Sequence, residues 1–172
     1  MSTVSLLLFV LASAPVTGTA TDPKAAITTV LDDWHKAAAQ ADEARYFGYF
    51  TPDAVYMGTD ATERWTRDEF RAWSKPYFSK GKAWSFKAVS RHITVSKDGA
   101  VAWFDETLDT PNLGPSRGSG VLVKDGGTWK IAQYNLSIPI PNDLMDEVVK
   151  RIQTQAPAKS APAPAPPAPK KK

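Results

Sequence analysis

The sequence predicts an α+β domain in which a curved antiparallel sheet meander wraps on N-terminal helices to form a cone-shaped α+β barrel. The prediction rests first on a change of hydrophobic period along the chain. Before Gly81, apolar residues recur at the spacing of amphipathic helices, and beyond it they alternate with the period of strands. Helices followed by a run of antiparallel strands are typical of the α+β class.

Turn sequences are the second observation. Lys97-Asp98-Gly99 and Asp125-Gly126-Gly127 have the composition of hairpin turns. They separate strands that we expect over residues 84–96, 100–110, 117–124 and 128–140. Proline cannot donate to a strand ladder, so Pro139 and Pro141 should close the last strand.

The first helices are predicted from apolar spacing. A helical stripe is formed by Ile27, Val30, Leu31, Trp34, Ala38 and Ala41. A second short helix is expected within residues 41–50, before Thr51-Pro52-Asp53 and a short strand at 54–58.

A third helix should begin at Thr66, because Thr66 and Glu69 match the capping box. Its apolar side carries Phe70, Trp73 and Tyr77. Pro76 should end or kink the helix near Lys75.

A final helix should follow the last strand, capped by Asn142 or Asp143. Its apolar stripe consists of Leu144, Met145, Val148, Val149 and Ile152.

The two ends of the chain fall outside this pattern. Residues 1–20 have an apolar core at 5–16 followed by Gly18-Thr19-Ala20, which is typical of a secretory signal peptide. This predicts a periplasmic or secreted protein with a folded domain over residues 21–155. Residues 156–172 form a Pro/Ala/Lys segment without large apolar side chains, which is expected to be disordered.

Charge argues against nucleic acid as a partner. Without the four lysines of the tail, the formal net charge of +3 becomes −1. A basic nucleic-acid-binding domain is therefore not expected. The tail itself is suited to weak contact with anionic envelope polymers.

Two patterns that could support catalysis are not convincing. Residues 114–118, GPSRG, match the nucleophile-elbow motif, but that motif needs a strand before the serine and a helix after it, whereas here a turn leads into a strand. With His35 and His92 as the only histidines and no cysteine, a three-histidine or thiolate zinc site cannot be built within one chain. We therefore predict neither a metal nor a cofactor.

Polar residues at apparently interior strand positions are the main functional candidates. Alternation places Arg91 with Val89, Ile93 and Val95, and it places Glu106 with Ala102, Phe104 and Leu108. On the same reasoning Arg117, Gln133 and Asn135 point inward from the last two strands. Because an unpaired buried charge is costly, either arginine should meet Glu106 or another acid.

Three interpretations of these residues remain open. They could form ion pairs that join the curved sheet, or they could converge on a pocket and orient a ligand. They could also face solvent if the assignment of strand faces is wrong.

Four blocks of sequence, in this order, carry a resemblance to a known family. They are FGYFTPDAVYMGTDATERW at 47–65, AWFDETL at 102–108, RGSGVL at 117–122 and WKIAQYNLSIPIPND at 129–143. Together they resemble the SnoaL-like branch of the nuclear transport factor 2-like superfamily over roughly residues 24–143. The resemblance implies a cone in which the sheet curls around a pocket, but a fold of this kind does not specify a reaction.

The resemblance also implies roles for individual residues. The loop that carries Asp60 and Glu63 should lie near the rim of the cone, where a carboxylate could act as a general base. In many relatives a histidine stands where Asn135 stands here. An asparagine hydrogen-bonds but does not shuttle a proton near neutral pH, so the sequence favours binding over catalysis at that point.

We therefore expect an exported SnoaL-like domain with a partly polar pocket that binds a small organic ligand. If there is turnover, it should be cofactor-free isomerase, dehydratase or hydrolase chemistry, with Glu106 as the base and Arg91 or Arg117 stabilising negative charge. The expected ligand-binding residues are Arg91, Arg117, Gln133, Asn135, Asp60 and Glu63.

The alternative is a non-catalytic homodimeric assembly or interaction module of the cell envelope. A ligand site predicts an enclosed cavity walled by Arg91, Glu106, Gln133 and Asn135. An assembly module predicts a filled cone and an exposed apolar sheet face.

Overall fold

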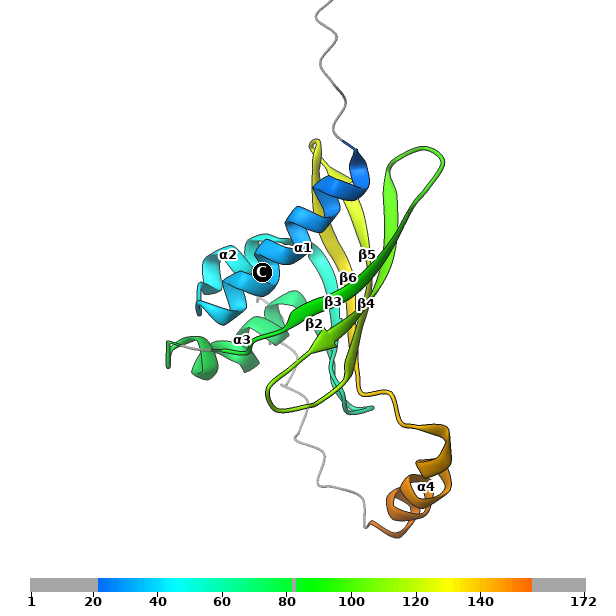
Figure 1. The fold of residues 1–172 in the computed structure, drawn as a ribbon. Helices are drawn as coiled ribbons and strands as arrows, with labels where there is room; N and C mark the ends of the chain where they lie inside the picture. The colour runs from blue at the N-terminus through cyan, green and yellow to red at the C-terminus, as the bar shows by residue number, and fades with distance from the viewer. Residues whose placement is uncertain (1–21, 82, 156–172) are drawn as a thin grey trace, which may run out of the picture.

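The structure is a computed structural model that describes residues 22–81 and 83–155. Three helices lie against one face of a curved sheet, and a fourth helix stands apart from both (Figure 1). The predicted signal peptide at 1–20 and the predicted tail at 156–172 lie outside the described residues. The α+β fold class and its cone-like arrangement are confirmed, although the sheet is open and does not close into a barrel.

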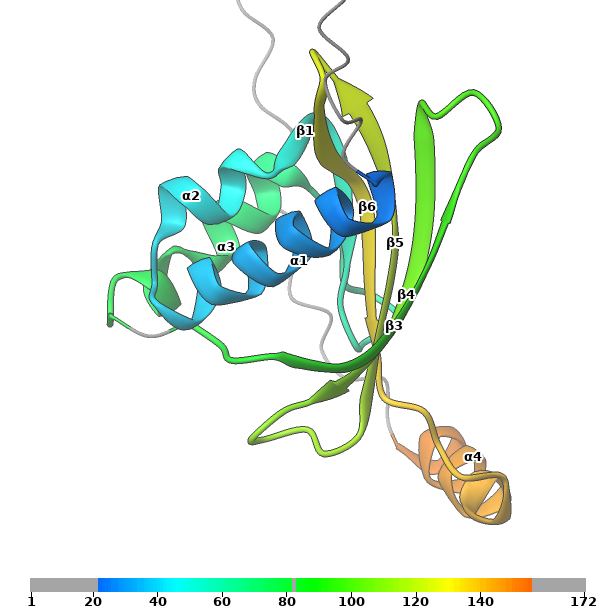
Figure 2. The same cartoon turned by 45° about the horizontal axis from the view of Figure 1, so that its top comes forward.

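The first two helices begin at side-chain caps. α1 spans Pro23–Ala39, and the Asp22 carboxylate accepts a hydrogen bond from the Lys24 N–H. Pro23 occupies the first turn, where its missing N–H costs nothing. α2 spans Glu43–Gly48 and is capped by Asp42. Both helices lie on the concave side of the sheet (Figure 2).

The third helix, α3, spans Arg67–Phe78 and has the predicted capping box between Thr66 and Glu69. Of the two outcomes expected for Pro76, an end or a kink near Lys75, the first is wrong, because the helix continues to Phe78. Pro76 lies in the last turn, so it interrupts little of the helical ladder, and the Ser79 N–H still donates to the Lys75 carbonyl at 3.0 Å.

Six strands form one sheet in the order β2-β1-β6-β5-β4-β3. They are β1 Phe50–Met57, β2 Arg64–Thr66, β3 Lys87–Val95, β4 Val101–Asp109, β5 Ser116–Asp125 and β6 Thr128–Ser137. The four long strands β3 to β6 form the predicted antiparallel meander. β1 joins the sheet parallel to β6, which brings the β1–β2 loop beside the end of the last strand.

Among the pairings of β3 to β6, the register is irregular at two places. The β3–β4 register shifts between Ala88 and Ser90. The β5–β6 register shifts where Val121 pairs with Gln133 and Leu122 pairs with Ile131. A bulge bends the strand and exchanges the two faces for every residue beyond it.

Aromatic side chains connect the helices to the sheet. Trp34 of α1 is 1% exposed, and its ring lies 4.6 Å from that of Tyr134 on β6 and 5.1 Å from that of Tyr46 on α2. Burying side chains of this size contributes roughly 1.5–3 kcal/mol each. This core holds α1 across the concave face of the sheet.

The last helix, α4, spans Met145–Thr154 and follows a short 3-10 turn, η1, at Asn142–Leu144. The expected cap from Asn142 or Asp143 is wrong, because Leu144 occupies the cap position and no side chain caps the helix. None of its residues is buried, and both views show α4 away from the sheet (Figures 1 and 2). In the described part of the chain, no helix has the length and apolar character needed to cross a membrane.

Candidate functional site

Glu106 is the centre of a buried ionic cluster. It is 1% exposed, and β3–β4 pairing sets it directly opposite Arg91. The Arg91 Nε donates to Glu106 Oε2 at 2.8 Å. On the other side, His35 Nε2 of α1 lies 2.7 Å from Glu106 Oε1. The carboxylate thus joins two strands to the first helix.

Two further side chains complete this cluster. Arg91 Nη1 donates to Asp32 Oδ1 at 2.8 Å, and the Tyr134 hydroxyl donates to Glu106 Oε1 at 3.3 Å. Gly118 leaves the space for Tyr134 and Glu106, because a Cβ there would overlap the Tyr134 hydroxyl and lie 2.8 Å from Glu106 Oε1.

The cluster keeps Glu106 ionised. Burial alone would raise the pKa of this carboxyl, but the hydrogen bond and charge of His35, followed by those of Arg91, outweigh burial and hold the pKa below its usual value. Burial, followed by the charge of Glu106, raises the pKa of the Tyr134 hydroxyl. A carboxylate with one oxygen bound by Arg91 and the other by His35 corresponds to the ion-pair interpretation of the sequence.

The inward placement predicted for Arg117, Gln133 and Asn135 is wrong. On β5 the buried positions are Ser116, Gly118, Gly120 and Leu122, so Arg117 is exposed on the outer face. On β6 the bulge exchanges the two faces after Ile131. As a result Tyr134 points inward, the direction predicted for Gln133 and Asn135. Gln133 is exposed, and Asn135 is half-buried on the outer face.

The two carboxylates of the β1–β2 loop have different surroundings. Asp60 is exposed and accepts hydrogen bonds from Thr62 Oγ1 at 2.6 Å and from the Thr62 N–H at 2.8 Å, which lower its pKa. Glu63 is half-buried and accepts a hydrogen bond from the Asp60 N–H at 3.2 Å. Of the two, only Glu63 lines the pocket at this end of the sheet.

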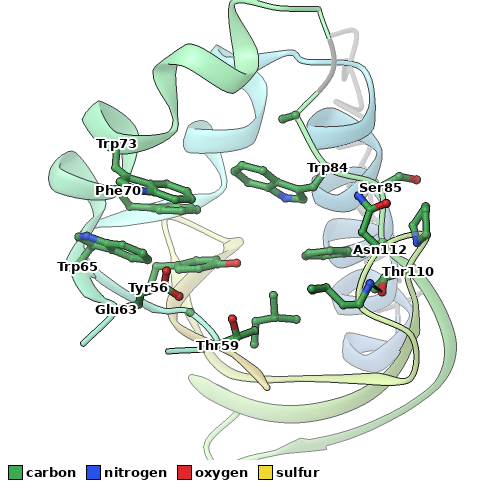
Figure 3. A pocket seen from close by; sticks show the side chains of 16 residues that line it. Tyr56, Thr59, Glu63, Trp65, Phe70, Trp73, Trp84, Ser85, Thr110 and Asn112 are labelled. Carbon is green, nitrogen blue, oxygen red and sulfur yellow. Dashed lines mark hydrogen bonds between the residues drawn. The ribbon is translucent and has the colours of Figure 1, made fainter. Parts of the chain in front are cut away.

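This pocket has a volume of about 350 Å³ and lies between α3, the β1–β2 loop, the segment before β3 and the loop after β4 (Figure 3). It is lined by Tyr56, Gly58, Thr59, Glu63, Trp65, Phe70, Trp73, Ala83, Trp84, Ser85, Phe86, Thr110, Pro111, Asn112, Leu113 and Leu136. The expected wall residues Arg91, Glu106, Gln133 and Asn135 do not line it.

One wall of the pocket is aromatic. The rings of Trp65 and Trp73 stack with centroids 5.0 Å apart, and Phe70 stacks on Tyr56 at 3.8 Å. The ring centroid of Trp84, which lies in the segment before β3, is 5.7 Å from that of Phe70. The capped helix α3 supplies Phe70 and Trp73, so the capping box at its first residue also orients this wall.

The facing wall carries polar side chains among apolar ones. Figure 3 shows Ser85, Thr110 and Asn112 across the pocket from Trp65 and Trp73. The Thr110 hydroxyl is held in place, because it donates to the Gly114 carbonyl at 3.0 Å and accepts from the Leu113 N–H at 3.1 Å. A flat apolar body could lie against the rings while a polar group faces this wall.

Sequence reasoning missed most of this pocket. It recognised Glu63 but not Asn112, which lies in the loop after β4. The strand expected over 84–96 includes Trp84 and Ser85, whereas β3 begins only at Lys87 and these two residues line the pocket. The available signal was the number of tryptophans, six in the chain, of which Trp65, Trp73 and Trp84 meet here.

Metal ligation has no support within residues 22–81 and 83–155. In that part of the chain, no group of three or more His, Asp or Glu side chains is placed to hold a metal ion.

Comparison with protein families agrees with this architecture. The profile of the SnoaL-like domain matches residues 27–141, which is most of the chain. The chain belongs to the SnoaL-like family. The resemblance seen in the sequence is therefore confirmed, and no curated protein matches this SnoaL-like chain significantly.

Solved structures show the same fold at low sequence identity. A nuclear transport factor 2-like protein of unknown function from Pseudomonas putida is 13% identical with a TM-score of 0.60, covering 73% of this chain and 93% of that one. A candidate aromatic ring hydroxylase from Novosphingobium aromaticivorans is 15% identical with a TM-score of 0.60, covering 75% and 94%. A candidate ketosteroid isomerase from Parabacteroides distasonis is 16% identical with a TM-score of 0.54, covering 67% and 86%.

Proposed function

We propose that this SnoaL-like domain binds a small organic molecule in the pocket between α3 and the end of the sheet. The observation that carries the proposal is the pairing of an aromatic wall with convergent polar groups in a pocket of about 350 Å³. Pockets of this size and composition are typical of small-molecule sites.

If the pocket supports turnover, Glu63 would act as its general acid or base. It is the one carboxylate among the described lining residues, and it stands beside apolar rings where a substrate C–H or O–H could be placed. The candidate isomerase and hydroxylase among the structural relatives are consistent with a fold that accommodates such substrates. Glu106 is enclosed by Arg91 and His35, so its role would be structural: it would hold together the sheet and helix that frame the site.

Blocking the pocket tests the proposal. Ser85→Trp adds a large ring to the pocket lining, whereas Ser90→Trp adds the same ring at an exposed position of β3. A panel of small aromatic and alicyclic compounds should raise the melting temperature of the unmodified protein and of the Ser90 variant, but not that of the Ser85 variant. A panel without any stabilising compound, or equal stabilisation of both variants, would refute the proposal.

A second candidate function is self-assembly through the outer face of the sheet. Trp103 is 50% exposed there and is paired with Val121, and Val101 is paired with Val123 on the same face. An exposed tryptophan beside three valines is the kind of apolar patch that marks protein contacts. This favours a homodimer, with or without ligand binding.

Sedimentation equilibrium would test assembly. The unmodified protein should dimerise at micromolar concentration, and Trp103→Lys should remain monomeric because a charge would be buried in the interface. An unmodified protein that stays monomeric at every concentration measured would exclude this function.

Export is a further part of the proposal. It is supported by the apolar segment at 5–16 and by the small residues Gly18-Thr19-Ala20 that follow it. Mass spectrometry of the protein recovered from a cell-envelope extract should show an N-terminus near residue 21, and recovery of the intact chain from the cytoplasm would contradict it.

A further inference from the structure

The described residues that line the aromatic pocket include an acidic side chain but no basic one. Among the described lining residues, Glu63 is the only one with a carboxylate side chain, and none is a lysine, arginine or histidine. A carboxylate in such a site repels anionic ligands and attracts cations. The pocket is therefore electrostatically suited to one class of organic molecule.

The position of the Glu63 carboxylate is defined by its neighbours. Its loop is closed by backbone hydrogen bonds from the Gly58 N–H to the Glu63 carbonyl at 2.9 Å and from the Glu63 N–H to the Asp60 carbonyl at 3.0 Å. A Cβ on Gly58 would overlap the carboxylate, so the glycine lets it lie against the backbone at the end of β1. Within the described part of the chain, Glu63 forms no ion pair.

The carboxylate also lies close to the rings. Burial raises the pKa of the Tyr56 hydroxyl, and the charge of Glu63 raises it further, which places the two groups within electrostatic reach. Figure 3 shows Glu63 and Tyr56 side by side below Trp65. A ligand group that contacts the carboxylate would therefore also lie near the aromatic rings.

Aromatic faces attract cations through their quadrupoles, and tryptophan does so most strongly. The wall presents Trp65 and Trp73 stacked at 5.0 Å, with Trp84 and Tyr56 around Phe70. Several ring faces beside one carboxylate are the arrangement that recognises quaternary ammonium groups in other proteins.

We propose that the pocket selects compact organic cations, namely quaternary ammonium compounds or protonated amines with an apolar body, through the aromatic wall and Glu63. The inference rests on the proposed binding function and names its ligand class. Ser85 and Asn112 on the facing wall would take a hydroxyl or carbonyl at the other end of the ligand.

A pair of compounds that differ only in charge tests the inference without any mutation. 3-Hydroxyphenyltrimethylammonium and 3-tert-butylphenol have nearly the same shape, but only the first is a cation. Titration calorimetry on the purified protein should show the cation binding at least about ten-fold tighter than the neutral compound.

Variants separate the carboxylate from general charge effects. Glu63→Gln should weaken binding of the cation by about five-fold or more and leave the affinity for the neutral compound unchanged. Asp53→Asn removes the same charge from an exposed position of β1 outside the pocket, and it should leave both affinities unchanged.

The outcomes distinguish the two proposals. If the neutral compound binds as tightly as the cation or tighter, the inference is overturned while the proposed binding function stands. If neither compound binds and the wider panel also fails, both are overturned. If Glu63→Gln does not fold, the comparison on the unmodified protein still decides the matter.

Discussion

Arg91 and Glu106 lie directly opposite each other on adjacent strands, and the Arg91 side chain is only 7% exposed. Two of its nitrogens reach Glu106 Oε2, Nε at 2.8 Å and Nη2 at 2.7 Å. A buried pair of this kind contributes little net stability, but removing one partner leaves an uncompensated charge in the core. The cluster should therefore be sensitive to single substitutions.

Glu106→Gln should lower the free energy of unfolding by about 3 kcal/mol, because it leaves the buried Arg91 charge with only the exposed Asp32 as counter-ion. Urea denaturation followed by tryptophan fluorescence measures the change. Asp105→Asn is the control. It alters the exposed pair with His92 and should change the free energy of unfolding by no more than roughly 0.5 kcal/mol. A stable Glu106 variant with abolished turnover would instead favour Glu106 as a catalytic base.

Acidification should destabilise the protein partly through Glu106. Its pKa is lower in the folded protein than the usual 4.5, so the unfolded chain binds this proton more readily. The stabilisation is complete above the usual value and is lost as the pH falls through the folded-state pKa. Unfolding free energies measured from about pH 6 down to about pH 3 should fall less steeply in Glu106→Gln than in the unmodified protein. Equal slopes would show that Glu106 is not the titrating group.

Gly118→Ala should destabilise the domain by about 2 kcal/mol through overpacking against Tyr134 and Glu106. Adding Tyr134→Phe should restore part of that loss, because it removes the hydroxyl that the new methyl group meets. Gly48→Ala in α2, where nothing lies within 4 Å, should be neutral or slightly stabilising. Thermal melts of these proteins and of Tyr134→Phe alone complete the double-mutant cycle, and a lack of coupling between Gly118 and Tyr134 would contradict this packing.

Removal of the chain after Ile140 should leave the stability of the domain unchanged within roughly 0.5 kcal/mol, because no residue of η1 or α4 is buried. Urea midpoints of the shortened and complete chains test this. A large loss on truncation would show that α4 packs on the domain in solution.

The general order of helices and strands could be predicted because its signals are local. The capping box at Thr66 and the glycine turns at 97–99 and 125–127 act within a few residues of themselves, and the structure has each of them in place. The inward positions of Arg91 and Glu106 followed from simple alternation, since the chain from Arg91 to Val95 and the whole of β4 keep an unbroken register.

The sequence by itself determined the fold class, the family and the two residues of the central ion pair. Only the tertiary structure decided which other side chains face inward, because strand alternation is local whereas a bulge arises where a sheet must curve. The bulge before Gln133 puts Tyr134 in the core and the amides outside. The pocket depends on tertiary structure for the same reason: its walls come from a loop, a helix and two connecting segments, and no sequence period links residues that meet only when the sheet curls around them.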